Sequence, residues 1–385
     1  MDINANVRDA VNRPIRIVEP QMEDVHHAPF NAALLHTVAL AFPATTITFE
    51  ALPEHLHIVR QIVAQYAPDV PERIQWQALP PARGNSLWAR WKRNAGLIRN
   101  TLARRERILF CSISRMQLLQ LKRTMGPHDD VRAVLHGDLD QIEQPRMESF
   151  PKSLFALDRV LQRRHPRGLR YVLLSDSIRA HLPAHIAAAM RSIGVIDHPY
   201  HFPAIGPIAD GPPVFGTFGN TGDGRLLEAV ARTVKQQDPT IGFSLIGFLS
   251  DDEAVERLRT WVDGVTKSPI SRELFEQRAD AITHALWLAE PDGFRLRASG
   301  TFFDALAHGK PLIYTRNPFI DSFGAVEAGI GVSCATVDDV PPALLRIAAQ
   351  TEAAYAEMQT AILRFRVRFS PEHLAEHLPA ALDWN

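Results

Sequence analysis

Short apolar runs alternate with longer amphipathic stretches along nearly the whole of this 385-residue chain. Examples of the runs are IRIV at 15–18, ILFCSI at 108–113 and RYVLLS at 170–175, and a helical pattern follows each of them. Near-continuous apolar runs are typical of strands that helices cover on both faces of a parallel sheet. The repeated strand–helix units therefore predict an α/β fold built from doubly wound parallel sheets.

A proline-rich segment at 197–214 divides this alternation into two halves. The segment holds five prolines and two glycines. Because proline lacks a backbone donor and fixes φ, the segment cannot lie in a helix or a central strand. We therefore predict two Rossmann-like domains joined by this hinge, the N-terminal one at 1–196 and the C-terminal one at 215–368. A last helix at 369–385 is a candidate to pack back on the N-terminal domain.

The charge and cysteine content exclude several classes of protein. The 42 Lys and Arg residues balance 43 Asp and Glu residues, whereas a general nucleic-acid binder carries a basic excess. Cys111 and Cys334 lie far apart in apolar, strand-like runs, so we expect two buried free thiols and neither a disulfide framework nor a zinc cage. The polar N-terminus and the lack of an apolar run of ~18 residues predict a cytoplasmic protein without a transmembrane helix.

The strongest local signal is the stretch ASGTFFDALAHGKPLIY at 298–314. Small and hydroxyl residues at 299–301 open a predicted helix, so its first backbone N–H groups and the positive end of its dipole are exposed. Such a helix start suits a phosphate or diphosphate, and Arg297 can add a charge-assisted contact to the same anion. Asp304 follows one turn later on the same face, where a carboxylate can accept both hydroxyls of a ribose.

The segment DALAHGKP, from Asp304 to Pro311, resembles the C-terminal-domain signature of GT-B glycosyltransferases. That signature is an acidic residue, Ala, any residue, Ala, any residue, Gly, any residue and Pro. The resemblance implies two Rossmann-like domains with a cleft between them, and a nucleotide-sugar donor, with UDP favoured. Leu296 stands where many retaining members have Glu, so the stereochemical outcome stays open. The donor residues that the resemblance implies are Ser299, Gly300, Thr301 and Asp304.

A glycine-rich turn follows the first strand after the hinge. Its spacing is neither GxGxxG nor GxxxxGK[ST], so neither the dinucleotide fingerprint nor the P-loop applies. In GT-B enzymes the first loop of the C-terminal domain faces the phosphates of the donor. The resemblance therefore adds Gly219, Asn220 and Thr221 to the donor site, with a plain tight turn as the alternative.

Two further loops supply candidate catalytic bases. His136 and Asp138 follow a strand of the first domain, and ligands meet the carboxyl ends of parallel strands. Either side chain can take the proton of an acceptor hydroxyl. Asp138 and Asp140 also form a DxD triplet, which we attribute to chance. His27, in the loop after the first strand, is a candidate to bind sugar hydroxyls or to serve as the base.

The stretch 83–107 holds eight Lys or Arg residues against one Glu. Trp88 and Trp91 begin an apolar stripe at helical spacing, and basic residues such as Arg90 and Arg93 flank it. An amphipathic helix of this kind can lie on an anionic membrane surface or contact the acceptor. A helix that packs on the core and exposes a basic face is the alternative.

We therefore expect a metal-independent glycosyltransferase that moves a sugar from a nucleotide-diphosphate donor to a glycan or lipid-linked saccharide, as in bacterial polysaccharide synthesis. The expected partners are that donor, the acceptor and an anionic membrane surface, with no nucleic acid. No cofactor or metal is expected, since no HExxH motif, no GxSxG elbow and no His/Cys cluster is recognised. The alternatives are a nucleotide-sugar epimerase, a phosphorylase or a catalytically silent nucleotide-sugar-binding protein on the same fold.

Overall fold

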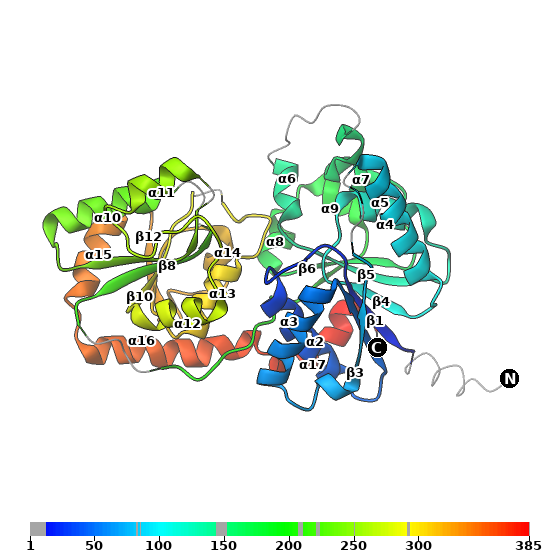
Figure 1. Cartoon of the computed structure of the whole chain (residues 1–385), viewed down its shortest axis with the longest axis horizontal. Helices are drawn as coiled ribbons and strands as arrows, with labels where there is room; N and C mark the ends of the chain where they lie inside the picture. Colours follow the sequence, from blue (N-terminus) through cyan, green and yellow to red (C-terminus); the bar gives the residue numbers. More distant parts are fainter. Residues whose placement is uncertain are drawn as a thin grey trace. The chain divides into compact units, whose positions relative to one another are not determined.

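The computed structural model describes residues 13–81, 84, 86–143, 152–206, 211–220, 224–249, 251–290 and 293–384. Within these residues the strands form two parallel sheets, one in each of two compact units (Figure 1). The predicted α/β class is therefore confirmed. The two units comprise Met1–His201, Leu296–Ala298 and Arg368–Asn385 in unit 1, and Phe202–Arg295 and Ser299–Val367 in unit 2.

The described strands of unit 1 form a seven-stranded sheet in the order β3-β2-β1-β4-β5-β6-β7. The chain starts at β1, proceeds outward to β3, and returns to place β4 on the other side of β1. This reversal of strand order opens a crevice at the carboxyl ends of β1 and β4, where ligands bind in sheets of this type. The strands are β1 Ile15–Glu19, β2 Ile47–Ala51, β3 Ile74–Ala78, β4 Arg107–Phe110, β5 Asp130–Leu135, β6 Leu169–Leu173 and β7 Ile193–Val195.

Helices cover both faces of the unit 1 sheet. On one face α2, α3 and α17 pack together, and on the other α4, α5, α7 and α9 do so (Figure 1). Apolar side chains from both helix layers and the sheet form one continuous core. The helices of unit 1 are α2 Ala28–Ala41, α3 Pro53–Tyr66, α4 Leu87–Leu102, α5 Arg115–Thr124, α6 Asp140–Glu143, α7 Leu157–Gln162, α8 Asp176–His181, α9 Ala184–Met190 and α17 Pro371–Leu382.

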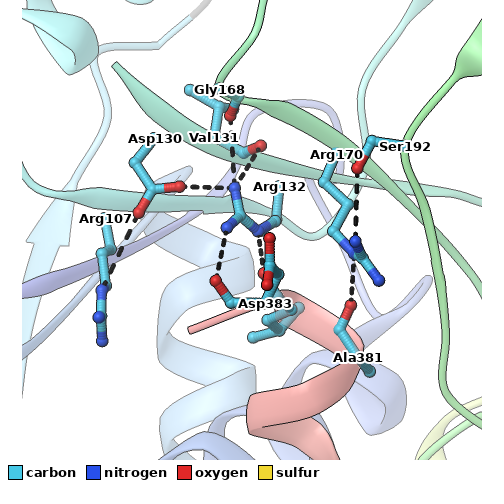
Figure 2. A network of polar contacts seen from close by, with 10 residues as sticks. Arg107, Asp130, Val131, Arg132, Gly168, Arg170, Ser192, Ala381 and Asp383 are labelled. Carbon is cyan, nitrogen blue, oxygen red and sulfur yellow. Dashed lines mark hydrogen bonds and ion pairs between the residues drawn. The ribbon is translucent and has the colours of Figure 1, made fainter. Parts of the chain in front are cut away.

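The C-terminal helix α17 belongs to unit 1, where it lies beside α2, and side chains from the sheet hold its end. Arg132 on β5 donates hydrogen bonds to the carbonyl oxygens of Leu382 and Asp383, and Arg170 on β6 donates to that of Ala381 at 2.8 Å (Figure 2). The last carbonyls of a helix lack partners within the helix, and cations stabilise the negative end of its dipole. The two arginines therefore cap α17 from outside.

The described strands of unit 2 form a five-stranded sheet in the order β12-β11-β10-β8-β9. Here β8 pairs with β9 on one side and with β10 on the other. The strand order therefore reverses between β8 and β10, and their carboxyl ends are the expected ligand position. The strands are β8 Val214–Asn220, β9 Gly242–Phe248, β10 His284–Trp287, β11 Leu312–Thr315 and β12 Gly331–Cys334.

Two helix layers also enclose the unit 2 sheet. Apolar residues of α10, α11 and α15 pack with the strands in one core cluster. A separate group of aromatic rings, including Phe302, Phe319 and Phe323, packs around α13 and α14. The helices of unit 2 are α10 Arg225–Gln237, α11 Asp252–Leu258, α12 Arg272–Ala281, α13 Gly300–Ala307, α14 Pro318–Asp321, α15 Val340–Ala348 and α16 Glu352–Phe365.

The structure differs from the sequence expectation mainly in short elements. The amphipathic pattern over 178–193 on its own predicts one helix, but the structure forms two, α8 and α9, because Pro183 interrupts the pattern. The edge strands β3 and β7 contain no long apolar run: in β3 two glutamines alternate with apolar residues and most of the strand is exposed, and β7 is three residues long. Gly309 ends α13 with φ of 62°, as expected for a glycine after a helix.

Two expectations about the whole chain can be compared with the structure. Cys111 and Cys334 are both free and buried, as predicted. Among the helices of the described residues, none is long and apolar enough to cross a membrane.

Candidate functional site

A buried carboxylate lies at the switch point of the unit 1 sheet. Glu19 ends β1 and is fully buried. Its Oε1 accepts hydrogen bonds from Ser112 Oγ at 2.5 Å and from the Gln21 backbone N–H at 3.0 Å, and Asn31 Nδ2 donates to Oε2 at 3.3 Å. Because a buried charge requires such partners, Glu19 fixes the loop that follows β1. Sequence reasoning missed Glu19, since one acidic residue at a strand end belongs to no motif.

The structure brings together two of the predicted bases, His27 and His136. Their rings stack with centroids 4.5 Å apart. His136 Nε2 lies 2.8 Å from the carbonyl oxygen of Cys111. Because a carbonyl can only accept, Nε2 carries the proton in the neutral ring, and Nδ1 keeps its lone pair. The fold thus selects the His136 tautomer in which Nδ1 is the basic atom.

Both stacked rings are neutral at pH 7. Burial, and after it the neighbouring His27 and His198, lowers the pKa of His136 well below its usual value. Burial also lowers the pKa of His27, against the opposing effect of the Glu19 charge. A neutral imidazole can accept a proton, but a strongly lowered pKa makes it a weak base.

Asp138, unlike the two histidines, has a raised pKa. It lies half-buried in the single 3₁₀ turn Gly137–Leu139 that follows β5, and Gln141 Nε2 donates a hydrogen bond to its Oδ1 at 2.8 Å. Burial raises the pKa of Asp138, against the opposing effects of Arg115 and of this hydrogen bond. A carboxylate with a raised pKa is a stronger base than an ordinary carboxylate, so burial favours Asp138 in the role of base.

Arg297 lies in unit 1, whereas the sequence suggested a role at the helix start that follows it. The short segment Leu296–Ala298 belongs to unit 1, and Leu296 is fully buried in the core of that unit. Arg297 Nε lies 3.0 Å from Asp140 Oδ2, and its Cδ lies 3.8 Å from the position of a Cβ on Gly137. The structure thus places Arg297 against the loop that carries His136 and Asp138.

The basic helix predicted within 83–107 is α4, and part of it packs on the core. Trp91 is half-buried against the core of unit 1, and Trp88 is 64% exposed. The ammonium of Lys92 lies 5.2 Å from the centre of the Trp88 ring, and the guanidinium of Arg123 lies 5.9 Å from that of Trp91. The exposed end of α4 therefore carries an aromatic side chain beside cations, as the membrane interpretation requires.

The other side of α4 forms the wall of a cavity of about 520 Å³ in unit 1. The loop after β1, the carboxyl ends of β2 and β3, and the start of α5 complete the wall. Arg90 and Arg93, which the sequence predicted for a membrane or acceptor patch, both line this cavity. It lies at the same edge of the sheet as Glu19, His27 and His136, because all of them follow the carboxyl ends of strands.

The structure brings together the two predicted donor stretches of unit 2. Gly219 in β8 has φ of 76°, and a Cβ on it would lie 2.5 Å from Thr301 Cγ2 at the start of α13. Only glycine allows both this backbone conformation and this approach. The carboxyl end of β8 therefore contacts the first turn of α13 at the switch point. Asn220 ends β8, and Thr221 lies outside the described residues.

A tryptophan orders the hydroxyl groups at the start of α13. Ser299 is the N-cap, and its Oγ accepts a hydrogen bond from the backbone N–H of Phe302 at 3.4 Å. The indole N–H of Trp287, at the end of β10, lies 3.1 Å from both Ser299 Oγ and Thr301 Oγ1. The two hydroxyls are thereby held in place. Trp287 was not singled out from the sequence, because a tryptophan at the end of an apolar run resembles any core residue.

Gly300 and Asp304 are the accessible members of this helix start. Gly300 is exposed, and a Cβ on it would meet no protein atom within 4 Å. Asp304 is half-buried and, one turn further along α13, lies on the same face as Thr301. Since no protein atom fills the space beside Gly300, that space is open to a ligand.

Lys310 and a cluster of side chains on α17 are of the residue types that hold a cofactor or a metal. Lys310 is buried, and its Nζ donates to the carbonyl oxygens of Ile282 at 2.7 Å and Asp280 at 3.2 Å. Burial lowers its pKa to about 8, but these bonds make it a structural residue. Among the described residues, one group of metal-ligand type occurs on α17 and comprises His373, Glu376 and His377. Their ligand atoms lie within 4.8 Å of one another. No motif in the sequence had indicated this group.

Comparisons with known proteins show the fold of the chain. No protein-family model matches the sequence, and no curated protein matches it significantly. Solved structures do match over nearly the full length. HepE from Anabaena, solved with UDP and glucose, is 12% identical with a TM-score of 0.61, and the match covers 96% of this chain and 99% of HepE.

Two further structures match over a similar span. A glycosyltransferase from Rickettsia africae is 12% identical with a TM-score of 0.61, covering 97% of this chain and 98% of its own. The N-terminal domain of a trehalose-6-phosphate phosphatase from Candida albicans is 10% identical with a TM-score of 0.60, covering 97% of both chains. These similarities, together with the two parallel sheets, confirm the predicted GT-B fold.

Proposed function

We propose that the chain is a glycosyltransferase that transfers a sugar from a nucleotide-diphosphate donor to a hydroxyl group of a saccharide acceptor. The observation that carries the proposal is the whole-length likeness to HepE, a structure that contains UDP and glucose. Fold alone does not determine chemistry. The proposal therefore also depends on the groups that gather at the switch point of each sheet.

Unit 2 supplies the donor site in this proposal. The diphosphate lies at the start of α13 beside Gly300, where the helix dipole and backbone N–H groups favour an anion. The ribose lies against Asp304, one turn further along the same face, and Gly219 and Asn220 border the site from β8. We favour UDP as the nucleotide, because HepE was solved with it.

Unit 1 supplies the acceptor site and the base. The acceptor hydroxyl attacks the anomeric carbon of the donor sugar, its proton passes to Asp138 or to Nδ1 of His136, and the nucleoside diphosphate leaves. Burial raises the pKa of Asp138 and so strengthens this carboxylate as a base, whereas burial lowers the pKa of His136 and weakens the imidazole, and we therefore favour Asp138. His27, stacked on His136, orients that ring and offers a further hydrogen-bonding group to the acceptor.

The charge that develops on the leaving diphosphate requires stabilisation. In this proposal the start of α13 provides it through fixed dipoles, with no metal required. Arg297 is assigned a share of the same task, because it lies two residues before the N-cap Ser299 in the chain. Addition of EDTA should therefore leave turnover unchanged, and a loss of activity that Mg²⁺ or Mn²⁺ restores would contradict the metal-independent mechanism.

The acceptor is proposed to be a glycan or a lipid-linked saccharide, reached from an anionic membrane surface on the cytoplasmic side. Support comes from the exposed Trp88 and the neighbouring cations of α4. Vesicles that contain phosphatidylglycerol should sediment the protein at low salt, and Trp88→Ala should weaken this binding. Equal sedimentation with neutral and anionic vesicles would contradict the membrane contact.

The donor site can be tested by thermal-shift measurements and calorimetry with UDP, GDP and UDP-sugars. We expect UDP to raise the melting temperature and Gly300→Ala to weaken UDP binding about tenfold, because its methyl group would occupy the space proposed for the diphosphate. Gly206→Ala is the matched control, since a Cβ on Gly206 also meets no atom within 4 Å. Asp304→Ala should weaken UDP binding as well.

The outcomes separate the proposal from its alternatives. No stabilisation by any nucleotide would exclude both a transferase and a nucleotide-sugar-binding protein. Nucleotide binding without hydrolysis or transfer of any donor sugar would favour the catalytically silent alternative. Equal UDP affinity in Gly300→Ala and wild type would show that the diphosphate does not bind at the start of α13.

A further inference from the structure

The cavity of about 520 Å³ in unit 1 has a polar floor, whose Glu50 and Gln77 accept hydrogen bonds from within the protein. Arg16 is buried, and its Nε lies 2.5 Å from Glu106 Oε2, while its Nη1 bonds to Glu50 and lies 3.2 Å from Gln77 Oε1. Burial raises the pKa of Glu50, and the Arg16 charge opposes that effect. Glu50 and Gln77 both face the cavity, so the floor presents oxygen acceptors at fixed positions.

The rim of the cavity is basic. Four cationic side chains line it, Arg90, Lys92 and Arg93 from α4 and Arg104 just beyond the end of that helix. The acidic residues of the lining are Glu50, which Arg16 already pairs, and the exposed Glu23. The four cationic side chains outnumber the two acidic ones, so the lining carries a net positive charge.

Amide side chains complete the lining. Asn94, Asn100 and Gln117 line the same cavity. Gln117 Nε2 lies 3.4 Å from Asn94 Oδ1, which fixes the position of both amides. Amides and carboxylates are the groups that recognise sugar hydroxyls, since amides both donate and accept hydrogen bonds and carboxylates accept them. An apolar ligand would cover the exposed amide of Asn100 without offering it a partner, which costs free energy.

We propose that this cavity binds the acceptor, and that the acceptor is a saccharide with an anionic substituent, a phosphate or a carboxylate. The ligand's role as the acceptor rests on the proposed function, whereas its chemical class is inferred from the cavity alone. The sugar hydroxyls lie toward Glu50, Gln77 and the amides, and the anionic group lies toward Arg90 and Arg104. Guanidinium groups bind phosphate and carboxylate oxygens through paired, charge-assisted hydrogen bonds.

The size of the cavity agrees with this assignment. Ligand pockets commonly enclose about 300–1,000 Å³, and about 520 Å³ suits one or two sugar rings. The position also agrees, because the loop after β1 that forms one wall, with Gln21 and Glu23, continues directly into His27. A saccharide held in the cavity therefore lies along the same sheet edge as the proposed bases.

The test uses the full-length protein and isothermal titration calorimetry, without any donor. The probes are glucose 6-phosphate, glucuronate, glucose and inorganic phosphate. We expect glucose 6-phosphate or glucuronate to bind at least about tenfold more tightly than glucose and than inorganic phosphate, and to bind more weakly as salt is added. Tighter binding of glucose 6-phosphate would identify the substituent as a phosphate, and tighter binding of glucuronate would identify it as a carboxylate.

Variants on one helix locate the binding. Arg90→Ala and Arg104→Ala should each weaken binding of the anionic sugar about tenfold. Arg99→Ala is the matched control, because Arg99 lies on α4 but lines a different groove, with Trp88 and Trp91. Asn100→Ala should weaken both anionic and neutral sugars, since it removes a contact to hydroxyls.

Three results would overturn the inference. Glucose that binds as tightly as its anionic derivatives would remove the charge preference, and inorganic phosphate that binds as tightly as glucose 6-phosphate would show a simple anion site. An equal loss in Arg99→Ala and Arg104→Ala would place the binding elsewhere. Failure of UDP to bind unit 2 would contradict the proposed function but would leave these measurements unaffected.

Discussion

At the scale of single residues, buried histidines are a prominent feature of unit 1. His36 Nδ1 lies 3.1 Å from His201 Nε2, and the Tyr66 ring stacks on His201 with centroids 4.7 Å apart. Burial, followed by the His36 charge, lowers the pKa of His201 to about 3, and burial also lowers the pKa of His36, opposed by Glu372. Only one proton can lie between the two facing nitrogens, so the two rings cannot both be charged, and burial disfavours a charge on either ring.

The stability of unit 1 should therefore fall in acid. An unfolded histidine takes up a proton near pH 6.5, whereas folded His201 does so only near pH 3. The unfolded state thus binds more protons between these values, and stability is lost as pH falls from about 6.5 toward 3. Each such histidine should contribute about 1.4 kcal/mol per pH unit. Urea unfolding from pH 5.0 to 7.5 measures this slope.

Variants identify the source of the slope. His201→Gln should reduce the pH dependence of the free energy of unfolding, because the glutamine has no charged form to exclude. His57→Gln, at an exposed position on α3, should leave the slope unchanged. A slope that stays the same in His201→Gln would mean that other groups cause the acid sensitivity.

At the scale of elements, α17 is held at its end by side chains of the sheet that lie more than two hundred residues away in the chain. Arg132 contributes most. It bonds to two carbonyl oxygens of the helix end and lies 2.6 Å from Asp130 (Figure 2). Its guanidinium also lies 5.2 Å from the centre of the Trp384 ring. Removing Arg132 leaves a carboxylate and two carbonyl groups without their main partner.

We predict that Arg132→Met lowers the free energy of unfolding of unit 1 by about 3 kcal/mol, the range found when one partner of a buried ion pair is removed. Arg170→Met is the matched control on the next strand. It loses one charged hydrogen bond to the helix end and should cost about 1.5 kcal/mol. Guanidinium-chloride unfolding measures both values. Equal losses in the two variants would show that the contacts unique to Arg132 contribute nothing.

The elements show how far sequence reasoning reaches. The alternation of apolar runs and amphipathic stretches predicted most strands and the last helix, because central strands are buried and therefore apolar. The edge strands were not predicted, because β3 alternates apolar residues with glutamines and is mostly exposed, so it contains no continuous apolar run. At the site, the helix start at 299–301 was predicted from its small residues. Glu19, Trp287 and the cavity were not, because each depends on contacts between residues distant in sequence.

At the scale of the whole molecule, unit 1 is discontinuous. Its sheet comes from the first half of the chain, but α17 and the buried Trp384 come from the last residues. The apolar side of α17, with Leu374, Leu378 and Leu382, is buried in the core of that unit. Unit 2 takes no strand or helix from beyond Val367.

Truncation after Val367 should therefore unfold unit 1 and spare unit 2. Hydrogen exchange followed by mass spectrometry should show loss of protection in β1, β4 and β5, while β8 and β11 keep theirs. Binding of UDP, if it occurs in unit 2 as proposed, should survive the truncation. Persistent protection of β1 and β5 would show that α17 is dispensable, and loss of protection in both units would show that they fold as one.

The position of α17 also sets an order of events at the ribosome. Domains generally fold as they emerge, the first before the second. In this chain the unit that is translated first lacks α17 until residues 371–382 have been made. The nascent chain therefore exposes the face of α2 that α17 later covers, after the residues of unit 2 have been made. Synthesis of unit 1 begins before that of unit 2 and ends after it, so unit 1 exposes apolar surface for longer.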